Sequence, residues 1–159
     1  MQHLFVTEFL KKCKTQYIHT AIETCGYCSW EKMKAILEYT DMVFMDIKHL
    51  NDTQHRKITG ASNRTILENA HKISRIRPLT IRIPIVPGCN DSEQNIRETA
   101  RFAAQLGEKL QKVELLPYHE LGVDTYRRLG MTYSLEGTKS SSQEYMKRLQ
   151  EVVEQEFCK

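Results

Sequence analysis

The chain has 159 residues, of which 40% are hydrophobic and 27% are charged, and its formal net charge is +3. This composition is typical of a single ordered globular domain. The positive charge is weak and not clustered, which argues against a nucleic-acid-binding protein. No apolar stretch approaches the roughly 20 residues of a membrane span, and the N-terminal segment lacks the parts of a secretory signal.

Cysteine usage favours a cytoplasmic protein. The five cysteines are odd in number and irregularly spaced, which indicates reduced thiols rather than a disulfide framework. They are Cys13, Cys25, Cys28, Cys89 and Cys158. Cys25 and Cys28 form a CxxC pair, a spacing that suits zinc or redox exchange, although a structural zinc normally needs four ligands. A zinc or redox protein built on this pair is one alternative interpretation.

The first part of the chain predicts two strands and two helices. A helical pattern runs from Phe5 to about Lys14, and a strand pattern follows over Ile18–Thr24. Ser29 can cap the next helix, and Met42–Lys48 is a nearly continuous apolar strand of the kind found in covered parallel sheets. The polar connection 51–60 has room for about one helical turn.

In the middle of the chain, Asn63 is expected to cap a helix over Thr65–Ser74. Leu79–Ile83 is the third expected strand. Pro84 and Pro87 are expected to mark its end, because proline cannot donate a hydrogen bond to a central ladder.

The last part of the chain predicts a helix that opens at Ser92 and stops at Gly107, and then a strand over Lys112–Leu116. The stretch from His119 to about Ser140 is expected to be irregular, and a final helix begins near Ser141. Because strands alternate with helical segments, the whole pattern predicts βα units and a parallel α/β sheet.

Each expected strand ends in residues that can bind a ligand. These residues are Glu23 and Thr24, Asp46 and Lys48, Arg82, and His119. The carboxyl ends of parallel strands lie at one edge of the sheet, where ligands of such folds bind. We therefore expect polar side chains from four strands to meet at one rim.

Asp46 and Lys48 are two positions apart in a strand, so both are expected on the same side of the sheet. Such a pair can hold a zwitterion, or it can form an ordinary ion pair at a strand end. Glu23 and Thr24 add a carboxylate and a hydroxyl that would suit a hard cation beside Asp46, unless one faces a helix and the other faces solvent. His119 can equally well be a functional residue of this rim or an ordinary surface histidine.

Six strings of the sequence together resemble one protein family. They are HTAIETCGY, MDIKHLND, TGASNRTILENA, IRIPIVPGCND, ELLPYHELG and YRRLGMTYSLEG. The same motifs occur in this order in the activating enzymes of glycyl radical enzymes, such as the activase of pyruvate formate-lyase, which are radical S-adenosylmethionine (SAM) proteins. The resemblance implies an α/β fold: a partial radical-SAM (βα) barrel fragment with about four parallel strands covered by helices.

The resemblance also implies roles for individual residues. Asp46 and Lys48 match the D-x-K of the family, and His119 matches the histidine of LLPYH; all three would contact SAM. Glu23, Thr24 and Asp46 match a monovalent cation site beside the SAM carboxylate, although the family has aspartate where this chain has Glu23. Arg82 matches an arginine on the strand before the PG-x-(N/S)-D motif and would meet the target polypeptide.

The sequence departs from the family in its first part. The family uses a C-x3-C-x2-C motif to hold a [4Fe-4S] cluster and a G-G-E-P motif to hold SAM, and this sequence contains neither motif. Residues 1–159 would thus be a single domain with strands three to six of a six-stranded barrel, lacking the N-terminal cluster-binding part. No catalytic residue is expected in this part, and the chain alone is expected to be inactive.

The implied partners are a glycyl radical enzyme of the pyruvate formate-lyase type and, for a full-length parent, an electron donor such as flavodoxin or ferredoxin. A SAM-derived 5′-deoxyadenosyl radical would abstract hydrogen from a glycine of the partner. The strand Ile18–Thr24 would be an open edge across which two copies could associate. The competing interpretation is a catalytically inert half-barrel, either a binding module or the relic of a truncated gene.

Overall fold

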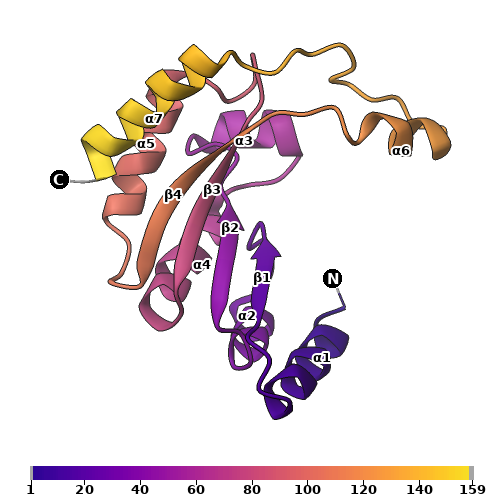
Figure 1. Ribbon diagram of the computed structural model, residues 1–159, viewed down its shortest axis with the longest axis vertical. Coiled ribbons are helices and arrows are strands. Elements are labelled where there is room, and N and C mark those ends of the chain that lie inside the picture. Colours follow the sequence, from indigo (N-terminus) through magenta and orange to yellow (C-terminus); the bar gives the residue numbers. More distant parts are fainter. Residues whose placement is uncertain (1, 158–159) are drawn as a thin grey trace.

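The computed structural model describes residues 2–157, and its centre is one sheet of four parallel strands in the order β1-β2-β3-β4 (Figure 1). The strands are β1 (Ala21–Thr24), β2 (Met42–Asp46), β3 (Leu79–Ile85) and β4 (Leu110–Pro117). Each strand pairs with the next one along the chain, and every pair is parallel. The predicted parallel α/β sheet is confirmed.

Seven helices connect or flank the strands in the described residues. They are α1 (His3–Thr15), α2 (Trp30–Leu37), α3 (Asp52–Thr59), α4 (Arg64–Ile76), α5 (Glu93–Ala104), α6 (Val123–Arg128) and α7 (Gln143–Phe157). Apolar side chains of α2, α4, α5 and α7 form one buried core with the sheet. No helix in the described part of the chain is long and apolar enough to cross a membrane.

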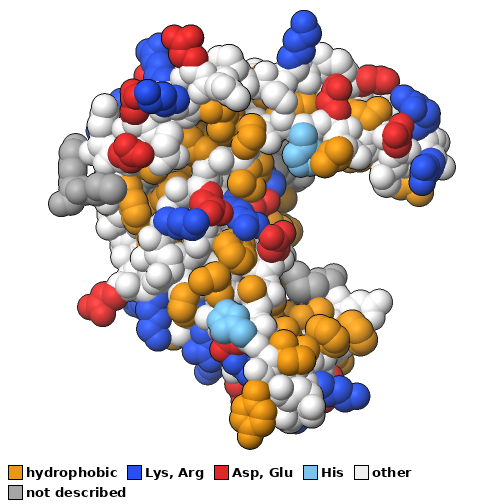
Figure 2. Space-filling model, in the orientation of Figure 1, with side chains coloured by type: hydrophobic (Ala, Val, Ile, Leu, Met, Phe, Trp, Pro, Cys, Tyr) orange, Lys and Arg blue, Asp and Glu red, His pale blue; other side chains and the backbone are white. Residues whose placement is uncertain are grey.

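The helices cover only one face of the sheet. In β2, Val43 and Met45 are fully buried, whereas Phe44 and Asp46 on the opposite face are partly exposed. The strand β3 follows the same alternation, because Ile81 and Ile83 are fully buried and Arg82 is not. The uncovered face forms the floor of a broad hollow between α1 and the segment that carries α6 (Figure 2). We call it the open face.

Four buried asparagines hold the loops that follow the strands. Each is at most 3% exposed, and each side-chain amide donates to loop carbonyls. Asn69 on α4 donates to the carbonyls of Gly26 and Cys28, at 2.8 and 2.9 Å. Asn63, which precedes α4, donates to the loop after β2. Asn90 and Asn95 join the loop after β2 to the loop after β3. These amides satisfy carbonyls that no ladder partner reaches.

Asn90 has the most central position of the four. Its amide nitrogen donates to the carbonyls of Lys48 and Pro84, at 2.8 and 2.7 Å, and its amide oxygen accepts from the backbone nitrogen of Val86 at 2.8 Å. One side chain therefore joins the chain that follows β2 to the end of β3.

Two expectations for the middle of the chain need correction. Asn63 does stand at the N-cap position of α4, but its side chain makes no capping hydrogen bond; its backbone is helical, and its amide donates to the carbonyls of His49 and Leu50 instead. Pro84 does not end β3, because it pairs with Leu116 inside the strand. The strand β2 has already ended at Asp46, so the missing N–H of Pro84 costs no ladder bond on that side.

Other elements differ in length from the predictions. The polar connection after β2 contains the eight-residue helix α3, which Asn51 caps by accepting from the backbone nitrogen of Gln54 at 3.0 Å. The strand β1 begins only at Ala21, and the nitrogen and hydroxyl of the preceding Thr20 donate to the Asp41 carboxylate. The expected irregular stretch from 119 to 140 contains the short helix α6.

A polar cluster fixes α1 to the lower end of the sheet. The Lys14 ammonium donates to Asp41, and the backbone nitrogen of Thr20 donates to the same carboxylate at 2.7 Å. The Lys14 hydrogen bond, followed by the Thr20 backbone bond, holds the pKa of Asp41 well below its usual value.

This shift predicts a pH-dependent contribution to stability. A carboxyl with a lowered pKa in the folded state stabilises that state above its ordinary pKa of 3.8, and the effect is lost as the pH falls further. Asp41→Asn should lower the free energy of unfolding at pH 7 by roughly 1 kcal/mol. The difference from wild type should shrink below about pH 4 in urea titrations. A difference that grows on acidification would contradict this account.

Removing the Asn90 amide should be more costly. Asn90→Ala leaves two carbonyls and one N–H without partners, and we expect a loss of about 2–4 kcal/mol in the free energy of unfolding, measured in urea. Gln94→Ala is the matched control, because this exposed amide bonds only to Glu98. The control should stay within about 0.5 kcal/mol of wild type. Equal effects of the two changes would show that the Asn90 contacts do not stabilise the fold.

Candidate functional site

The strand ends place the expected site residues along one rim. Asp46 is the cross-strand partner of Arg82, and Arg82 is the partner of Glu114 on β4. Beyond β2, the Asn90 amide nitrogen donates to the carbonyl of Lys48 and also to the carbonyl of Pro84 on β3. On the other side of β3, the Tyr118 nitrogen donates to the Ile85 carbonyl at 3.1 Å, so His119 follows directly at the same edge.

Asp46 and Lys48 form an ion pair at this rim. The Lys48 Nζ lies 2.6 Å from Asp46 Oδ2, and each side chain is about one third exposed, at 35% and 34%. The expected same-side placement is therefore present. The pair presents one positive and one negative charge side by side to solvent, which suits a ligand that carries both charges.

Glu23 and Thr24 lie on opposite sides of β1. Glu23 is on the open face, is 75% exposed, and accepts a hydrogen bond from Arg82 at 2.5 Å. The Thr24 hydroxyl accepts from the backbone nitrogen of Gly26 at 2.9 Å. Both residues also border a small apolar pocket with Met33 and Ile36 of α2. The hydrogen-bonding oxygens of Glu23 and Thr24 are nevertheless engaged with different partners, Arg82 and Gly26, in this structure.

Arg82 is the most constrained charged side chain of the open face. Its Nε donates to Glu114 at 3.0 Å, its Nη1 donates to Glu23, and its guanidinium carbon lies 3.9 Å from the ring centroid of Phe44. Lys112 also pairs with Glu114. Together these residues form a row of alternating charges across the sheet, visible in the middle of the face in Figure 2.

The opposite charges of this row stabilise one another's ionised forms. The hydrogen bond from Lys112, followed by the one from Arg82, lowers the pKa of Glu114 against the opposing effect of burial. Partial burial acts to lower the pKa of Arg82, but the hydrogen bonds that Arg82 donates to Glu23 and Glu114 outweigh it and raise that pKa. Glu114 was not among the predicted site residues. The alternation of β4 could have placed it on the open face, but only the register shows that it faces Arg82.

His119 is exposed, and in the described part of the chain its side chain makes no hydrogen bond or ion pair. The preceding Tyr118 is buried and bonds to the Tyr133 hydroxyl at 2.9 Å and to the Leu135 carbonyl at 3.3 Å. Burial, followed by the bond to Tyr133, raises the pKa of Tyr118 to about 12. This anchor fixes the backbone beside His119.

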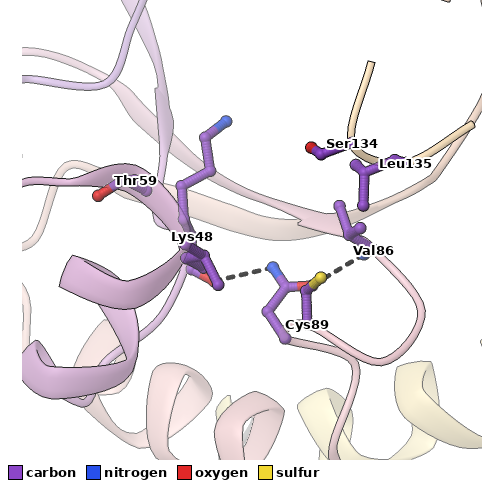
Figure 3. Close-up of a pocket in the computed structure, with 8 residues that line it drawn as sticks. Lys48, Thr59, Val86, Cys89, Ser134 and Leu135 are labelled. Atoms are coloured by element: carbon purple, nitrogen blue, oxygen red, sulfur yellow. Dashed lines mark hydrogen bonds between the residues drawn. The ribbon is translucent and has the colours of Figure 1, made fainter. Parts of the chain in front are cut away.

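A pocket of about 250 Å³ opens beside Lys48 (Figure 3). Its lining comes from the Lys48 segment, the end of α3, the loop after β3 and the segment after α6. The lining residues are Lys48, Ile58, Thr59, Val86, Cys89, Asn90, Ser134 and Leu135. The pocket is walled largely by apolar atoms, and its one charged side chain is Lys48. It could hold a flat apolar ring next to the Asp46–Lys48 pair.

Comparisons with known proteins decide the family. A model of the radical SAM superfamily matches residues 2–103. The chain belongs to the radical SAM superfamily. A crystal structure of a domain of pyruvate-formate lyase-activating enzyme from Bacteroides vulgatus superposes with a TM-score of 0.79 and 25% identity, over 97% of this chain and 86% of that domain. The predicted partial radical-SAM barrel fragment is confirmed.

The curated relatives carry the names of activating enzymes. An isethionate sulfite-lyase activating enzyme of Oleidesulfovibrio alaskensis is 44% identical over 128 residues, which are 79% of this chain and 40% of the relative. A pyruvate formate-lyase-activating enzyme of Clostridium pasteurianum is 37% identical over 156 residues, or 98% and 65% of the two chains. The predicted resemblance is therefore confirmed. The chain spans about half the length of the curated relatives it matches.

Membership of the radical SAM superfamily implies SAM and a [4Fe-4S] cluster as cofactors. The residues described here fit the first and not the second. The Asp46–Lys48 pair and the adjoining pocket match the charged and apolar parts of SAM. Within residues 2–157, no group of three or more His, Cys, Asp or Glu side chains is placed to hold a metal ion.

The two thiols of the CxxC pair are not joined in a disulfide. Cys25 is exposed and Cys28 is partly buried, and both are free thiols. Burial, followed by the neighbouring Cys25, raises the pKa of the Cys28 thiol. A raised pKa disfavours the thiolate that redox exchange and metal binding need. Cys158 lies outside the described residues.

We therefore expect slow alkylation of Cys28. With iodoacetamide at pH 8, Cys25 should be modified faster than Cys28, as followed by peptide mass spectrometry. In Cys25→Ser, Cys28 should stay slow, because burial is the larger cause of its raised pKa. Faster modification of Cys28 than of Cys25 would revive the redox interpretation of the pair.

Proposed function

We propose that this chain is the SAM-binding and partner-facing part of a glycyl radical enzyme activating enzyme. Its strands β1 to β4 would be strands three to six of the six-stranded barrel. The single observation that supports this best is the Asp46–Lys48 pair, which stands at the carboxyl end of β2 beside an apolar pocket.

SAM carries an ammonium, a carboxylate, a ribose and an adenine. Asp46 would accept hydrogen bonds from the ammonium or the ribose, and Lys48 would neutralise a carboxylate or donate to the ribose. The adenine would enter the apolar pocket beside Lys48. His119, exposed at the same rim, would donate or accept one further hydrogen bond.

A monovalent cation would lie next to the SAM carboxylate, with oxygen ligands from Glu23, Thr24 and Asp46. Hard cations prefer such oxygen donors. In this structure the Glu23 carboxylate is held by Arg82, so cation binding would require Glu23 to exchange one partner for the other.

The proposed partner is a glycyl radical enzyme of the pyruvate formate-lyase type. A 5′-deoxyadenosyl radical from SAM would abstract hydrogen from a glycine of that partner, with electrons from a flavodoxin or ferredoxin. The open face with Arg82 would receive the polypeptide. Association of two copies across the edge strand β1 is a further possibility of this proposal. The cytoplasm is the proposed compartment.

A second candidate function is a half-barrel that binds SAM or a partner but performs no reaction. One observation favours it: the described residues bring together no set of cluster ligands. Both candidates can use the SAM site, so a binding experiment tests the part they have in common. Reductive cleavage of SAM by the anaerobically reconstituted chain would exclude the inert half-barrel.

The binding experiment measures the dissociation constant of SAM by isothermal titration calorimetry. Asp46→Asn and Lys48→Met each remove one charge-assisted hydrogen bond, so each should weaken binding about ten- to hundredfold. Asp124→Asn is the control, because it breaks an exposed ion pair with Arg127 on α6. SAM affinities that stay unchanged in both rim variants would refute the assigned site.

A further inference from the structure

The Arg82 guanidinium is held unequally by its two glutamates. Glu114 is 26% exposed, lies directly across from Arg82 in the β3–β4 ladder, and is also paired with Lys112. Glu23 is 75% exposed and comes from the edge strand β1, two strands away. An exposed pair between long side chains is weak, so Glu23 is the partner that can be displaced.

The geometry explains how Glu23 reaches Arg82 at all. Glu23 is the cross-strand neighbour of Phe44 on β2, and the guanidinium lies against that same ring at 3.9 Å. The ring and Glu114 therefore fix the plane and the Nε edge of the guanidinium. Its Nη1 edge points toward β1 and, among the described residues, donates to the exposed carboxylate of Glu23.

The charges around Arg82 restrict what could replace Glu23. Lys112 and Arg82 are balanced by Glu23 and Glu114, so the row has no excess of positive charge for a phosphate or another polyanion. Release of Glu23 frees the hydrogen-bond donors of one guanidinium edge. Those donors fit one oxygen acceptor, such as a carboxylate or a main-chain carbonyl.

We propose that Glu114 is a positioning residue for Arg82, and that Glu23 occupies the place of an oxygen acceptor from a bound polypeptide segment. That the ligand is a polypeptide rests on the proposed function. The bound polypeptide would lie in the hollow above the open face (Figure 2). It would displace Glu23 from Arg82, while Glu114 keeps the guanidinium in position.

The test uses NMR titration of the full chain with two small probes at constant ionic strength. N-acetyltriglycine offers a carboxylate and main-chain carbonyls, whereas its C-terminal amide offers carbonyls alone. The readout is the Nε–Hε resonance of Arg82. A response to both probes assigns the acceptor as a main-chain carbonyl, a response to the acid alone assigns it as a carboxylate, and a response to neither overturns the proposal.

The variants should shift probe affinity in opposite directions. Glu23→Gln removes the competing carboxylate and should tighten binding about two- to fivefold, in line with the modest strength of exposed pairs. Glu114→Met should weaken binding at least threefold and speed solvent exchange of the Arg82 Nε–H. Glu114→Gln keeps an oxygen acceptor for Nε and should restore both readouts.

Arg82→Gln provides the matched background. In it, neither probe should shift the backbone amide resonances of β1 to β3, which replace the Arg82 side-chain signal as the readout, and adding Glu23→Gln should change nothing. Backbone spectra check that each variant is folded. If a Glu114 variant fails to fold, Glu23→Gln still tests the proposal, because Glu23 is exposed and its replacement leaves Glu114 in place. Unchanged or weaker probe binding in Glu23→Gln would overturn the inference. The titrations contain no SAM, so a failure of this inference would not affect the result of the SAM-binding experiment.

Discussion

Buried side-chain amides at the carboxyl edge of the sheet are the constraint on which the candidate site depends. Loops that leave parallel strands carry carbonyls that no neighbouring strand can pair, and an unpaired buried carbonyl is costly. An asparagine amide offers two donors and one acceptor, enough to join two loops. Asn90 does this for the chain after β2 and the end of β3, and the amides of Asn63, Asn69 and Asn95 donate to other loop carbonyls nearby. Every buried side-chain nitrogen and oxygen in residues 2–157 has a partner.

These amides decide where functional side chains lie. The backbone of Lys48 is past the end of β2 and has no ladder to hold it, yet its carbonyl is fixed by Asn90. The pocket beside Lys48 is lined by the same asparagine. The Asp46–Lys48 pair therefore stands on rigid backbone although it lies at a loop, and this rigidity is what a specific ligand site requires.

The second constraint is the one-sided covering of the sheet. Helices bury one face, so the opposite face can carry charge without full desolvation. There the charges separate into two groups. Asp46 is the cross-strand partner of Arg82, but its carboxylate bonds to Lys48, while Arg82 bonds to Glu23 and Glu114. One group adjoins the pocket and the other crosses the middle of the sheet, so the proposed SAM site and the proposed polypeptide site would lie side by side.

The sequence by itself determined the parallel α/β architecture and the family, because hydrophobic periodicity and motif order are local properties of the chain. It also predicted that Asp46 and Lys48 share a side, although Lys48 lies past the end of β2, where its backbone is held by Asn90 and not by a strand ladder. It did not determine the role of Asn63 or the course of β3 through Pro84, because each depends on where a neighbouring segment ends. Only the tertiary structure decided that Arg82 lies between Glu23 and Glu114, because strand register is set by packing across residues far apart in the chain.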